Sequence, residues 1–359
     1  MAMDYIKETK DISAEEAIIL WQASRLSLSK SYEKAPEILK VHSSVIGTLG
    51  NFSASIGKAK SKKTFNVSAI VAAALKNGTV LRYVAELPED KRKVLYVDTE
   101  QSPYHCLKVM TRILRMAGLP DDRDNENLEF LALRKYTPEQ RIRIVEQAIY
   151  NTPDIGLVII DGIRDMVYDI NSPGESTRII SKLMQWTDDR QIHIHTILHQ
   201  NKGDENARGH IGTELNNKAE TVLQVEKDKG NGDISHVSAI HIRAMDFEPF
   251  AFRINDKALP ELIEGYKPET KKPGRPEEEK FDPYRHITEQ HRIALEAAFG
   301  LKEEYGYKEL EDALIKTYMS VGVKLNHKKA VSLITMLRNK RMIVQENGRK
   351  YTFMPDFHY

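Results

Sequence analysis

Short apolar runs alternate with longer helical patterns between residue 45 and about residue 255. In the longer patterns apolar residues recur every three or four positions, which is the period of an amphipathic helix. Strands that alternate with helices of this length are typical of βαβ units and of a mostly parallel sheet covered on both faces. The predicted strands are FSASI, KVLYVDTE, LEFLALR, LVIID and IHIHTILH.

The pattern changes after residue 220, where TVLQVEKD, SHVSAIHIRA and FEPFAFRI follow one another without an intervening helix. Their apolar alternation is that of strands, and GNGD between the first two is turn-like. Consecutive strands that are joined without a crossover pair in the antiparallel sense. We therefore expect an α/β domain whose mostly parallel sheet carries antiparallel edge strands.

A proline-rich and charged segment, GYKPETKKPGRPEEEKFD, separates this domain from a second pattern. Its near-absence of apolar residues is typical of a linker. Three helical patterns follow, and then IVQENGRKYTF, two short strands around Asn347-Gly348, so that we predict a C-terminal winged helix-turn-helix. The predicted divisions are an N-terminal helical segment at 1–40, the α/β domain at 41–262, the linker at 263–284 and the winged helix at 285–359.

Composition narrows the class of protein. A chain of 359 residues with 41% apolar residues can form two domains with a sizeable core. The net charge of +1 does not mark a nucleic-acid binder, so any basic surface must be local, and the single cysteine, Cys106, excludes a disulfide framework. No apolar run approaches the roughly 20 residues that span a bilayer. The first residues lack a signal-peptide core, and we expect a soluble, cytoplasmic protein without a membrane partner.

The segment GKAKSKKTF nearly matches the phosphate-binding loop G-x-x-x-x-G-K-T. In the register that ends at Thr64, Lys63 would contact phosphate and the Thr64 hydroxyl would contact Mg²⁺, with a strand before the loop and a helix after it. Lys62 stands where the second glycine belongs, and a position that needs positive φ costs a non-glycine residue about 1 kcal/mol or more. A basic surface turn is the alternative reading. The nucleotide-binding residues of this register are Gly57, Lys58, Ala59, Lys60, Ser61, Lys62, Lys63, Thr64 and Phe65.

Three of the predicted strands end in polar side chains that such a site requires. Asp161 closes LVIID, where a carboxylate would hold the hydration shell of Mg²⁺. Glu100 ends KVLYVDTE, a strand that we expect beside the loop's own strand, and would polarise the attacking water, with Asp98 as the alternative base. His199 and Gln200, in TILHQNK, would sense the γ-phosphate. Because the carboxyl ends of parallel strands meet at one edge of a sheet, these residues and the loop predict a convergent site for ATP and Mg²⁺.

The order of these motifs resembles the RecA-like core. A P-loop, then "VDTE", "VIID" and "LHQNK…ARG", is similar within that class to the RepA-type hexameric replicative helicases and related ATPases of plasmids and mobilizable elements, over residues of about 40 to 255. The resemblance implies that Lys63 and Thr64 bind the phosphates and Mg²⁺. It also implies that Glu100 is the catalytic base and Asp161 the Mg²⁺ acid, with His199 or Gln200 as the sensor. Lys62 departs from the family pattern, which bears on turnover more than on nucleotide binding.

By the same likeness, Lys202 and Arg208 resemble a basic pair that reaches across a subunit interface to the γ-phosphate of the neighbour. Sites shared in this way require a ring-like homo-oligomer, and the family implies a hexamer that works on DNA with replication or mobilization proteins. The alternative for Arg208 is a surface pair with Asp204 or Glu205 on its own loop, worth about 0–1 kcal/mol.

Basic side chains gather in the third helical pattern of the predicted winged helix and in its hairpin. In such a fold the helix would enter a major groove while the wing touches phosphates. A solvated face or a protein-interaction module is the alternative. The predicted DNA-binding residues are Lys328, Lys329, Arg338, Lys340, Arg341, Arg349 and Lys350.

The run IHIHTILH brings His193, His195 and His199 onto one strand, and alternate histidines can ligate a metal. No nearby cysteine or acid in the sequence completes a ligand set, so we expect them to be ordinary strand residues.

These patterns predict an ATP-dependent motor that acts on DNA, of the type of a replicative helicase from a plasmid or mobile element. Two alternatives stay open. One is a regulatory DNA-binding ATPase of replication, partition or transposition that does not unwind DNA. The other is a non-enzymatic DNA-binding adaptor with a degenerate nucleotide site.

Overall fold

The computed structural model describes residues 12–200, 207–266, 281–285, 288–346 and 350–356. The chain divides into two compact units, Met1–Pro268 and Glu269–Tyr359, which are considered separately below.

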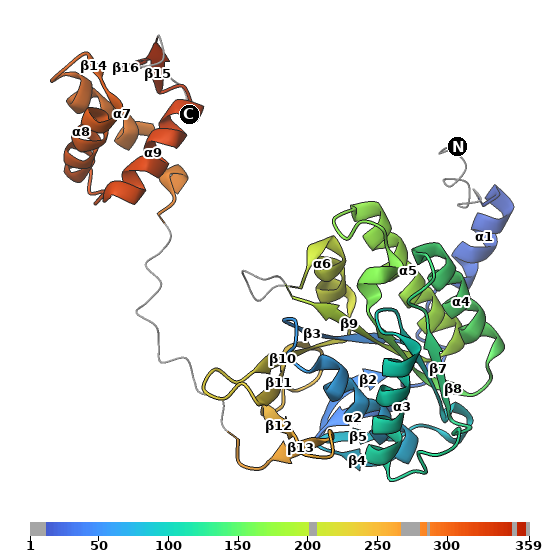
Figure 1. Cartoon of the computed structure of the whole chain (residues 1–359). Helices are drawn as coiled ribbons and strands as arrows, with labels where there is room; N and C mark the ends of the chain where they lie inside the picture. Colours follow the sequence, from blue (N-terminus) through green and yellow to red (C-terminus); the bar gives the residue numbers. More distant parts are fainter. Residues whose placement is uncertain (1–11, 201–206, 267–280, 286–287, 347–349, 357–359) are drawn as a thin grey trace. The chain divides into compact units, whose positions relative to one another are not determined.

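The first unit is built on a nine-stranded sheet with the order β13-β12-β11-β10-β3-β9-β8-β6-β7 (Figure 1). The strands from β10 to β7 in this order are parallel, and β11, β12 and β13 extend the sheet in the antiparallel sense. The α/β fold with a mostly parallel sheet and antiparallel edge strands is therefore confirmed. The strands are β3 (Phe52–Gly57), β6 (Lys93–Asp98), β7 (Leu128–Ala132), β8 (Ile155–Asp161), β9 (His193–His199), β10 (Thr221–Lys227), β11 (Ile234–Ile242), β12 (Phe250–Ile254) and β13 (Pro260–Ile263).

One predicted neighbour relation in the sheet is wrong. We expected the strand that carries Glu100 to lie beside the strand of the loop, but β9 and β8 separate β6 from β3. Periodicity shows that a strand exists, whereas its place in the sheet depends on how the crossover helices pack, which local sequence does not encode. Glu100 therefore approaches the loop across two intervening strands.

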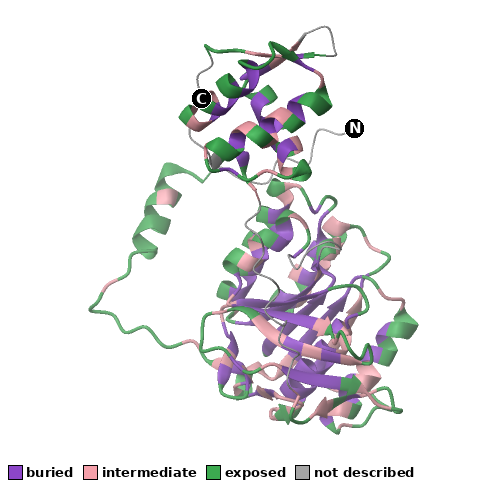
Figure 2. Ribbon diagram, turned by 90° about the vertical axis from the view of Figure 1, so that its left-hand side faces the viewer, coloured by how far each residue is buried: buried purple, intermediate pink, exposed green. Residues whose placement is uncertain are grey.

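Helices cover both faces of the sheet, whose strands are largely buried (Figure 2). The side chains of the strands alternate between two apolar cores. Val94 and Tyr96 of β6 face one core, together with α2 and α3, whereas Leu95 and Val97 face the other, together with α4, α5 and α6. This alternation is the two-residue period of a strand that is buried on both faces. The helices are α2 (Lys63–Lys76), α3 (Pro103–Ala117), α4 (Pro138–Asn151), α5 (Pro173–Arg190) and α6 (Gly209–Lys218), with short 3-10 turns at η1 (Glu89–Lys91) and η2 (Ile163–Met166).

A second, four-stranded sheet that the sequence did not predict belongs to the first unit. Its order is β2-β1-β5-β4, and its apolar residues join the core formed by α2 and α3. Its first strand begins at Glu37, within the segment expected to be helical. Helix α1 (Ala14–Ala23) precedes it, starts at a Ser13 capping box and has no buried residue. The strands are β1 (Glu37–Val41), β2 (Ser44–Thr48), β4 (Thr79–Val80) and β5 (Tyr83–Ala85).

The second unit contains the three predicted helices and the two strands of the predicted hairpin. A further strand, β14, pairs with β16 to give the order β14-β16-β15, and the turn at Asn347-Gly348 lies outside the described residues. The helices and the sheet enclose their own apolar core. The elements are η3 (Pro283–Arg285), α7 (Thr288–Phe299), β14 (Glu304–Tyr305), α8 (Tyr307–Ser320), α9 (His327–Asn339), β15 (Ile343–Glu346) and β16 (Lys350–Phe353).

Among the described residues, no helix combines the length and the apolar character needed to cross a bilayer.

The two fully buried histidines of β9 form a hydrogen-bonded chain with serines of β3. The His193 Nδ1 atom lies 2.9 Å from the Thr48 carbonyl oxygen, so it must donate, which leaves Nε2 as an acceptor for the Ser53 hydroxyl at 2.7 Å. Ser53 then accepts from Nδ1 of His195 at 2.7 Å, and Nε2 of His195 accepts from Ser55 at 2.8 Å. The whole chain is satisfied with both imidazoles neutral. Burial lowers the pKa of His193, and it lowers that of His195 to about 3.

Stability should fall with acidification because of these histidines. Below the ordinary histidine pKa of about 6.5 the unfolded chain takes up a proton at position 195, whereas the folded chain does not until a pH of about 3. The free energy of unfolding should therefore decrease by up to about 1.4 kcal/mol per pH unit across this window for His195 alone.

The check is urea unfolding at pH 7 and pH 5 for the native chain and for His195→Asn, whose side chain does not titrate. The variant should be less stable at pH 7 but should lose less stability between the two pH values. Equal losses in the two proteins would contradict a neutral His195 in the fold.

Candidate functional site

The loop between β3 and α2 is held close to its neighbours. A Cβ atom on Gly57 would lie 2.3 Å from the Val225 carbonyl oxygen and 2.7 Å from the Ser61 hydroxyl, so only glycine fits there. Lys60 and Lys62 have φ values of 64° and 68°. The position of the second glycine therefore has positive φ, and a lysine occupies it at the steric cost given above.

Lys62 is the N-cap residue of α2, and its side chain leaves the loop. Its ammonium group donates a hydrogen bond of 2.5 Å to the carbonyl oxygen of Asp233, in the turn between β10 and β11. This contact ties the loop to the antiparallel side of the sheet. Lys58, Ala59 and Lys60 are exposed, whereas Ser61 is buried. Phe65 lies under the guanidinium group of Arg112, whose carbon is 3.7 Å from the ring centroid.

Lys63 is the first residue of α2, and its buried ammonium group closes the loop. It donates to the carbonyl oxygens of Gly57 at 2.8 Å and Lys58 at 2.9 Å, and it lies 3.1 Å from Nδ1 of His199. Burial lowers the pKa of Lys63 to about 8, against the opposing effect of Asp161 and Glu100. At neutral pH the ammonium group therefore remains mostly charged. Because both of its carbonyl acceptors are neutral, it can exchange them for an anionic ligand.

Asp161 is buried at the end of β8 and accepts two hydroxyl hydrogen bonds. Its Oδ2 atom lies 3.1 Å from Thr64 Oγ1 and 2.9 Å from the hydroxyl of Tyr96. Burial raises the pKa of Asp161 to about 7, and the negative charge of Asp98 on the neighbouring strand adds to the effect. A cation beside this carboxylate would favour its charged form. The oxygen donors of Asp161 and Thr64 are those that Mg²⁺ prefers, so the residues fit the ion that the loop motif implies.

Tyr96 is a site residue that sequence reasoning missed. It lies two positions before Asp98 on β6 and faces the same core as α2. The two-residue period of a strand brings its hydroxyl toward the edge where Asp161 lies. The signal was present in KVLYVDTE, because a tyrosine in a fully buried strand requires a partner for its hydroxyl.

Glu100 and Asp98 differ in what their carboxylates contact. Asp98 is buried and accepts hydrogen bonds from the Glu100 amide at 3.0 Å and from the amide and side chain of Gln101, both at 2.7 Å. The side chain of Glu100 is 48% exposed, and its Oε1 atom lies 3.6 Å from Nε2 of His199. His199 is also the main cause of the lowered pKa of Glu100. Glu100 is thus ionised and accessible, whereas Asp98 is occupied in holding the turn.

The end of β9 stands between the loop and Glu100. His199 contacts Lys63 through one ring nitrogen and Glu100 through the other. Gln200 is buried, and its backbone amide donates to the Gly57 carbonyl oxygen at 3.0 Å. The structure therefore brings Lys63, Thr64, Glu100, Asp161, His199 and Gln200 together at the carboxyl edge of the sheet.

Of the two residues predicted to act in trans, the described part of the chain contains Arg208, whose side chain does not join this group. Lys202 lies outside the described residues. Arg208 is the N-cap residue of α6, its amide donates to the His199 carbonyl at 3.1 Å, and its side chain is exposed. Within the described part of the chain, Arg208 forms no ion pair. Its backbone is anchored to the end of β9, while its side chain is exposed to solvent.

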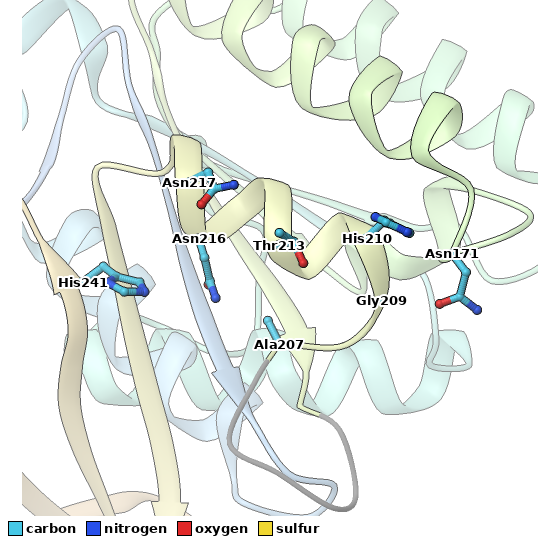
Figure 3. A pocket seen from close by; sticks show the side chains of 8 residues that line it. All are labelled: Asn171, Ala207, Gly209, His210, Thr213, Asn216, Asn217 and His241. Carbon is cyan, nitrogen blue, oxygen red and sulfur yellow. The ribbon is translucent and has the colours of Figure 1, made fainter. Parts of the chain in front are cut away.

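A hollow of about 600 Å³ lies beside α6, and none of its described lining residues belongs to the phosphate loop (Figure 3). Among the described residues, its polar lining consists of amide, imidazole and hydroxyl groups, without a lysine, an arginine or a carboxylate. These described residues do not supply the charges that a triphosphate and its metal require, and the loop remains the candidate nucleotide site. The lining residues are Asn171, Ala207, Gly209, His210, Thr213, Asn216, Asn217 and His241.

Most of the predicted DNA-binding residues lie on α9 and just after it. Lys328, Arg338 and Arg341 are exposed, and Lys329 and Lys340 lie over the rings of Phe281 and Tyr284 at 6.0 and 5.8 Å. Lys350 of β16 pairs with Glu304 at 2.9 Å, which neutralises part of the predicted wing. Arg349 lies outside the described residues.

Replacing Lys62 by glycine should leave nucleotide binding within about threefold of that of the native chain. The change removes a left-handed φ of 68° from a non-glycine residue, which offsets the lost contact with Asp233. Isothermal titration with a non-hydrolysable ATP analogue checks it. A loss of more than tenfold would show that Lys62 itself binds phosphate.

Comparison with known proteins gives one family match. Residues 33–205 match a family model described as "AAA domain". No curated protein matches the chain. Among solved structures, the crystal structure of the RadB recombinase is similar to this chain, with 15% identity and a TM-score of 0.41 over 58% of this chain and 90% of that one. The family match spans the loop, Glu100, Asp161 and Gln200, so residues 33–205 form an AAA-type P-loop domain.

Proposed function

We propose that this protein is an ATP-dependent motor acting on DNA, of the type of a replicative helicase from a plasmid or mobile element. The observation that carries the proposal is the gathering of Lys63, Asp161 and Glu100 around one loop, with His199 between the first and the last. ATP hydrolysis needs a phosphate-binding cation, a metal-holding acid and a base, and each is present there.

The proposed chemistry is in-line attack of water on the γ-phosphate of ATP. The ammonium group of Lys63 exchanges its two carbonyl partners for phosphate oxygens, and the N-terminus of α2 adds its partial positive charge. Thr64, and Asp161 by way of water, would hold Mg²⁺, which would supply charge stabilisation at the phosphates. The Glu100 carboxylate, whose pKa is lowered by the contact with His199, orients the water and accepts its proton.

Two contacts support the proposal that His199 senses the γ-phosphate. It contacts the residue that would bind phosphate and the residue that would polarise water. A phosphate that draws Lys63 away from His199 removes one partner of the imidazole. The imidazole can then shift, and Glu100, its other partner, shifts with it. Gln200 lies one residue further along and is fixed to Gly57 through its backbone.

Arg208 supports a site shared between subunits. Its exposed guanidinium group has no ion-pair partner in the described part of the chain, although its backbone is attached to the sensor strand. A cation in this position suits a neighbour's γ-phosphate, together with Lys202, in a ring-like homo-oligomer that we propose to be a hexamer. Replication or mobilization proteins are proposed as further partners.

The proposal that the second unit binds DNA rests on its basic residues. Three helices and a small antiparallel sheet are consistent with a winged helix-turn-helix, in which α9 enters the major groove and β15–β16 forms the wing. The exposed charges of Lys328, Arg338 and Arg341 would bind phosphates.

One observation favours a second function, that of a DNA-binding adaptor with a degenerate nucleotide site. Lys62 occupies a glycine position, and its ammonium group binds the carbonyl oxygen of Asp233 rather than a group of the loop. A protein of this kind would bind DNA with little or no ATP turnover.

The test is ATP hydrolysis with and without single-stranded DNA, combined with size measurement in ATP. A motor gives DNA-stimulated hydrolysis by an assembly, and an adaptor gives neither. A strand-displacement assay then separates a helicase from a regulatory ATPase, which would hydrolyse ATP on DNA without unwinding it.

Glu100→Gln should bind ATP with nearly native affinity and hydrolyse it about 10²–10⁴-fold more slowly, because the carboxylate acts in the transition state. Lys63→Ala is the contrasting variant and should lose binding as well. Nucleotide titration and steady-state kinetics measure the two quantities. If Asp98→Asn lowers kcat more than Glu100→Gln while remaining folded, the base has been assigned to the wrong acid.

Arg208→Ala protein should bind ATP and assemble but hydrolyse ATP slowly, since an arginine acting in trans is typically worth about 10³-fold or more. Mixing it with Glu100→Gln protein should restore activity, because some interfaces then combine an intact Glu100 with an intact Arg208. Near-native activity of the single variant would indicate a surface role. Activity that mixing never restores, in assemblies shown to be mixed, would indicate a role in cis.

A further inference from the structure

Arg141, on α4, connects the exits of three neighbouring strands. Its guanidinium group donates to the carbonyl oxygens of Leu133 at 3.1 Å, Arg134 at 2.9 Å, Asp165 at 2.7 Å and Thr99 at 3.4 Å. None of these carbonyls belongs to a strand, because β7 ends at Ala132, β8 at Asp161 and β6 at Asp98. One side chain therefore holds the segments that follow β6, β7 and β8.

Thr99 makes a second connection between the same segments. Its hydroxyl lies 3.0 Å from the Asp165 carboxylate, 3.0 Å from the Gly162 carbonyl oxygen and 3.1 Å from the Asp161 carbonyl oxygen. A hydroxyl has one proton, so it donates to one of these acceptors at a time. The Asp165 carboxylate is charged and gives the strongest bond. Arg141 thus reaches Thr99 both directly and through Asp165.

The close approach of these segments explains why Gly162 follows Asp161. Gly162 has a φ of 106°, and a Cβ atom there would lie 2.1 Å from Thr99 Oγ1. Any other residue would displace the hydroxyl. The turn that carries Glu100 therefore packs directly against the backbone that follows Asp161, and no side chain fits at position 162.

Glu100 is the residue that these contacts fix. Its amide is bound by Asp98, and the residue before it is held by Arg141 and by its own hydroxyl. The Glu100 side chain is half exposed, so packing alone does not define its position. Arg141 contacts neither the phosphate loop nor Lys63 in the hydrogen bonds of the described residues. Its effect should thus fall on the placement of the base rather than on nucleotide binding.

We propose that Arg141 and Thr99 are positioning residues that fix Glu100 for its role in hydrolysis. The proposal rests on the proposed ATPase function for its kinetic consequence, whereas the ordering of the turn is independent of it. Misplacement of a reacting group by about 1 Å can cost about 10²-fold in rate. Loss of either residue should therefore lower kcat by about 10- to 100-fold and leave KM and ATP affinity within about threefold.

The experiment uses the full chain and two pairs of variants. Arg141→Met removes the guanidinium group, and Arg143→Met, an exposed arginine on the same helix, is its control. Thr99→Val removes the hydroxyl with little change in shape, and Thr99→Ser keeps it. Each protein is measured for kcat, KM, ATP affinity and amide hydrogen exchange at Glu100 and Gln101, whose amides bind Asp98.

The proposal expects faster exchange at these two amides and lower kcat in Arg141→Met and Thr99→Val, with both near native in Arg143→Met and Thr99→Ser. Unchanged exchange in folded Arg141→Met and Thr99→Val would overturn it, and so would affinity that falls in step with kcat. If Arg141→Met does not fold, the Thr99 pair decides. If the native chain binds ATP without hydrolysing it, the proposed function fails, and hydrogen exchange still decides the positioning role.

Discussion

A buried carboxylate at the end of β8 is the constraint on which the site depends. Asp161 is removed from water, and an ionisable group in such a place is costly unless it is paired. Its partners come from different elements, the Thr64 hydroxyl from the start of α2 and the Tyr96 hydroxyl from β6. The bonds that satisfy Asp161 therefore hold the phosphate loop, β6 and β8 in fixed relation, which is the relation that a metal-dependent phosphate site requires.

The surroundings of Asp161 form two parts. One contains the proposed phosphate-binding residue, Lys63, and the other holds the turn that carries Glu100. On one side, Lys63 rests on loop carbonyls that a phosphate can replace. On the other, Arg141 and Thr99 hold the turn that carries Glu100. His199 contacts both Lys63 and Glu100, so one imidazole links the proposed phosphate-binding residue to the proposed base. In the proposed site this link would let His199 act as a sensor without a large movement of the chain.

Lys62 shows how an unfavourable residue is tolerated. Its backbone adopts the conformation that glycine would adopt, and its side chain gains a hydrogen bond to Asp233 in the turn between β10 and β11. The strain and the bond are of similar size, about 1 kcal/mol each. The loop therefore keeps its shape although it departs from the motif, and its departure links it to the β10–β11 turn.

The sequence by itself determined the parallel strands of the large sheet and the chemistry at their ends. Apolar periods identified the parallel strands and their helices, because burial on both faces leaves a continuous apolar run. The polar residues that close LVIID and KVLYVDTE were found because the carboxyl ends of parallel strands share one edge of the sheet. Only the tertiary structure decided the order of the strands, the small sheet beside α2, and the roles of Tyr96, Thr99 and Arg141. These depend on contacts between residues far apart in the chain, and local sequence carries no record of which distant carbonyl or carboxylate a side chain will meet.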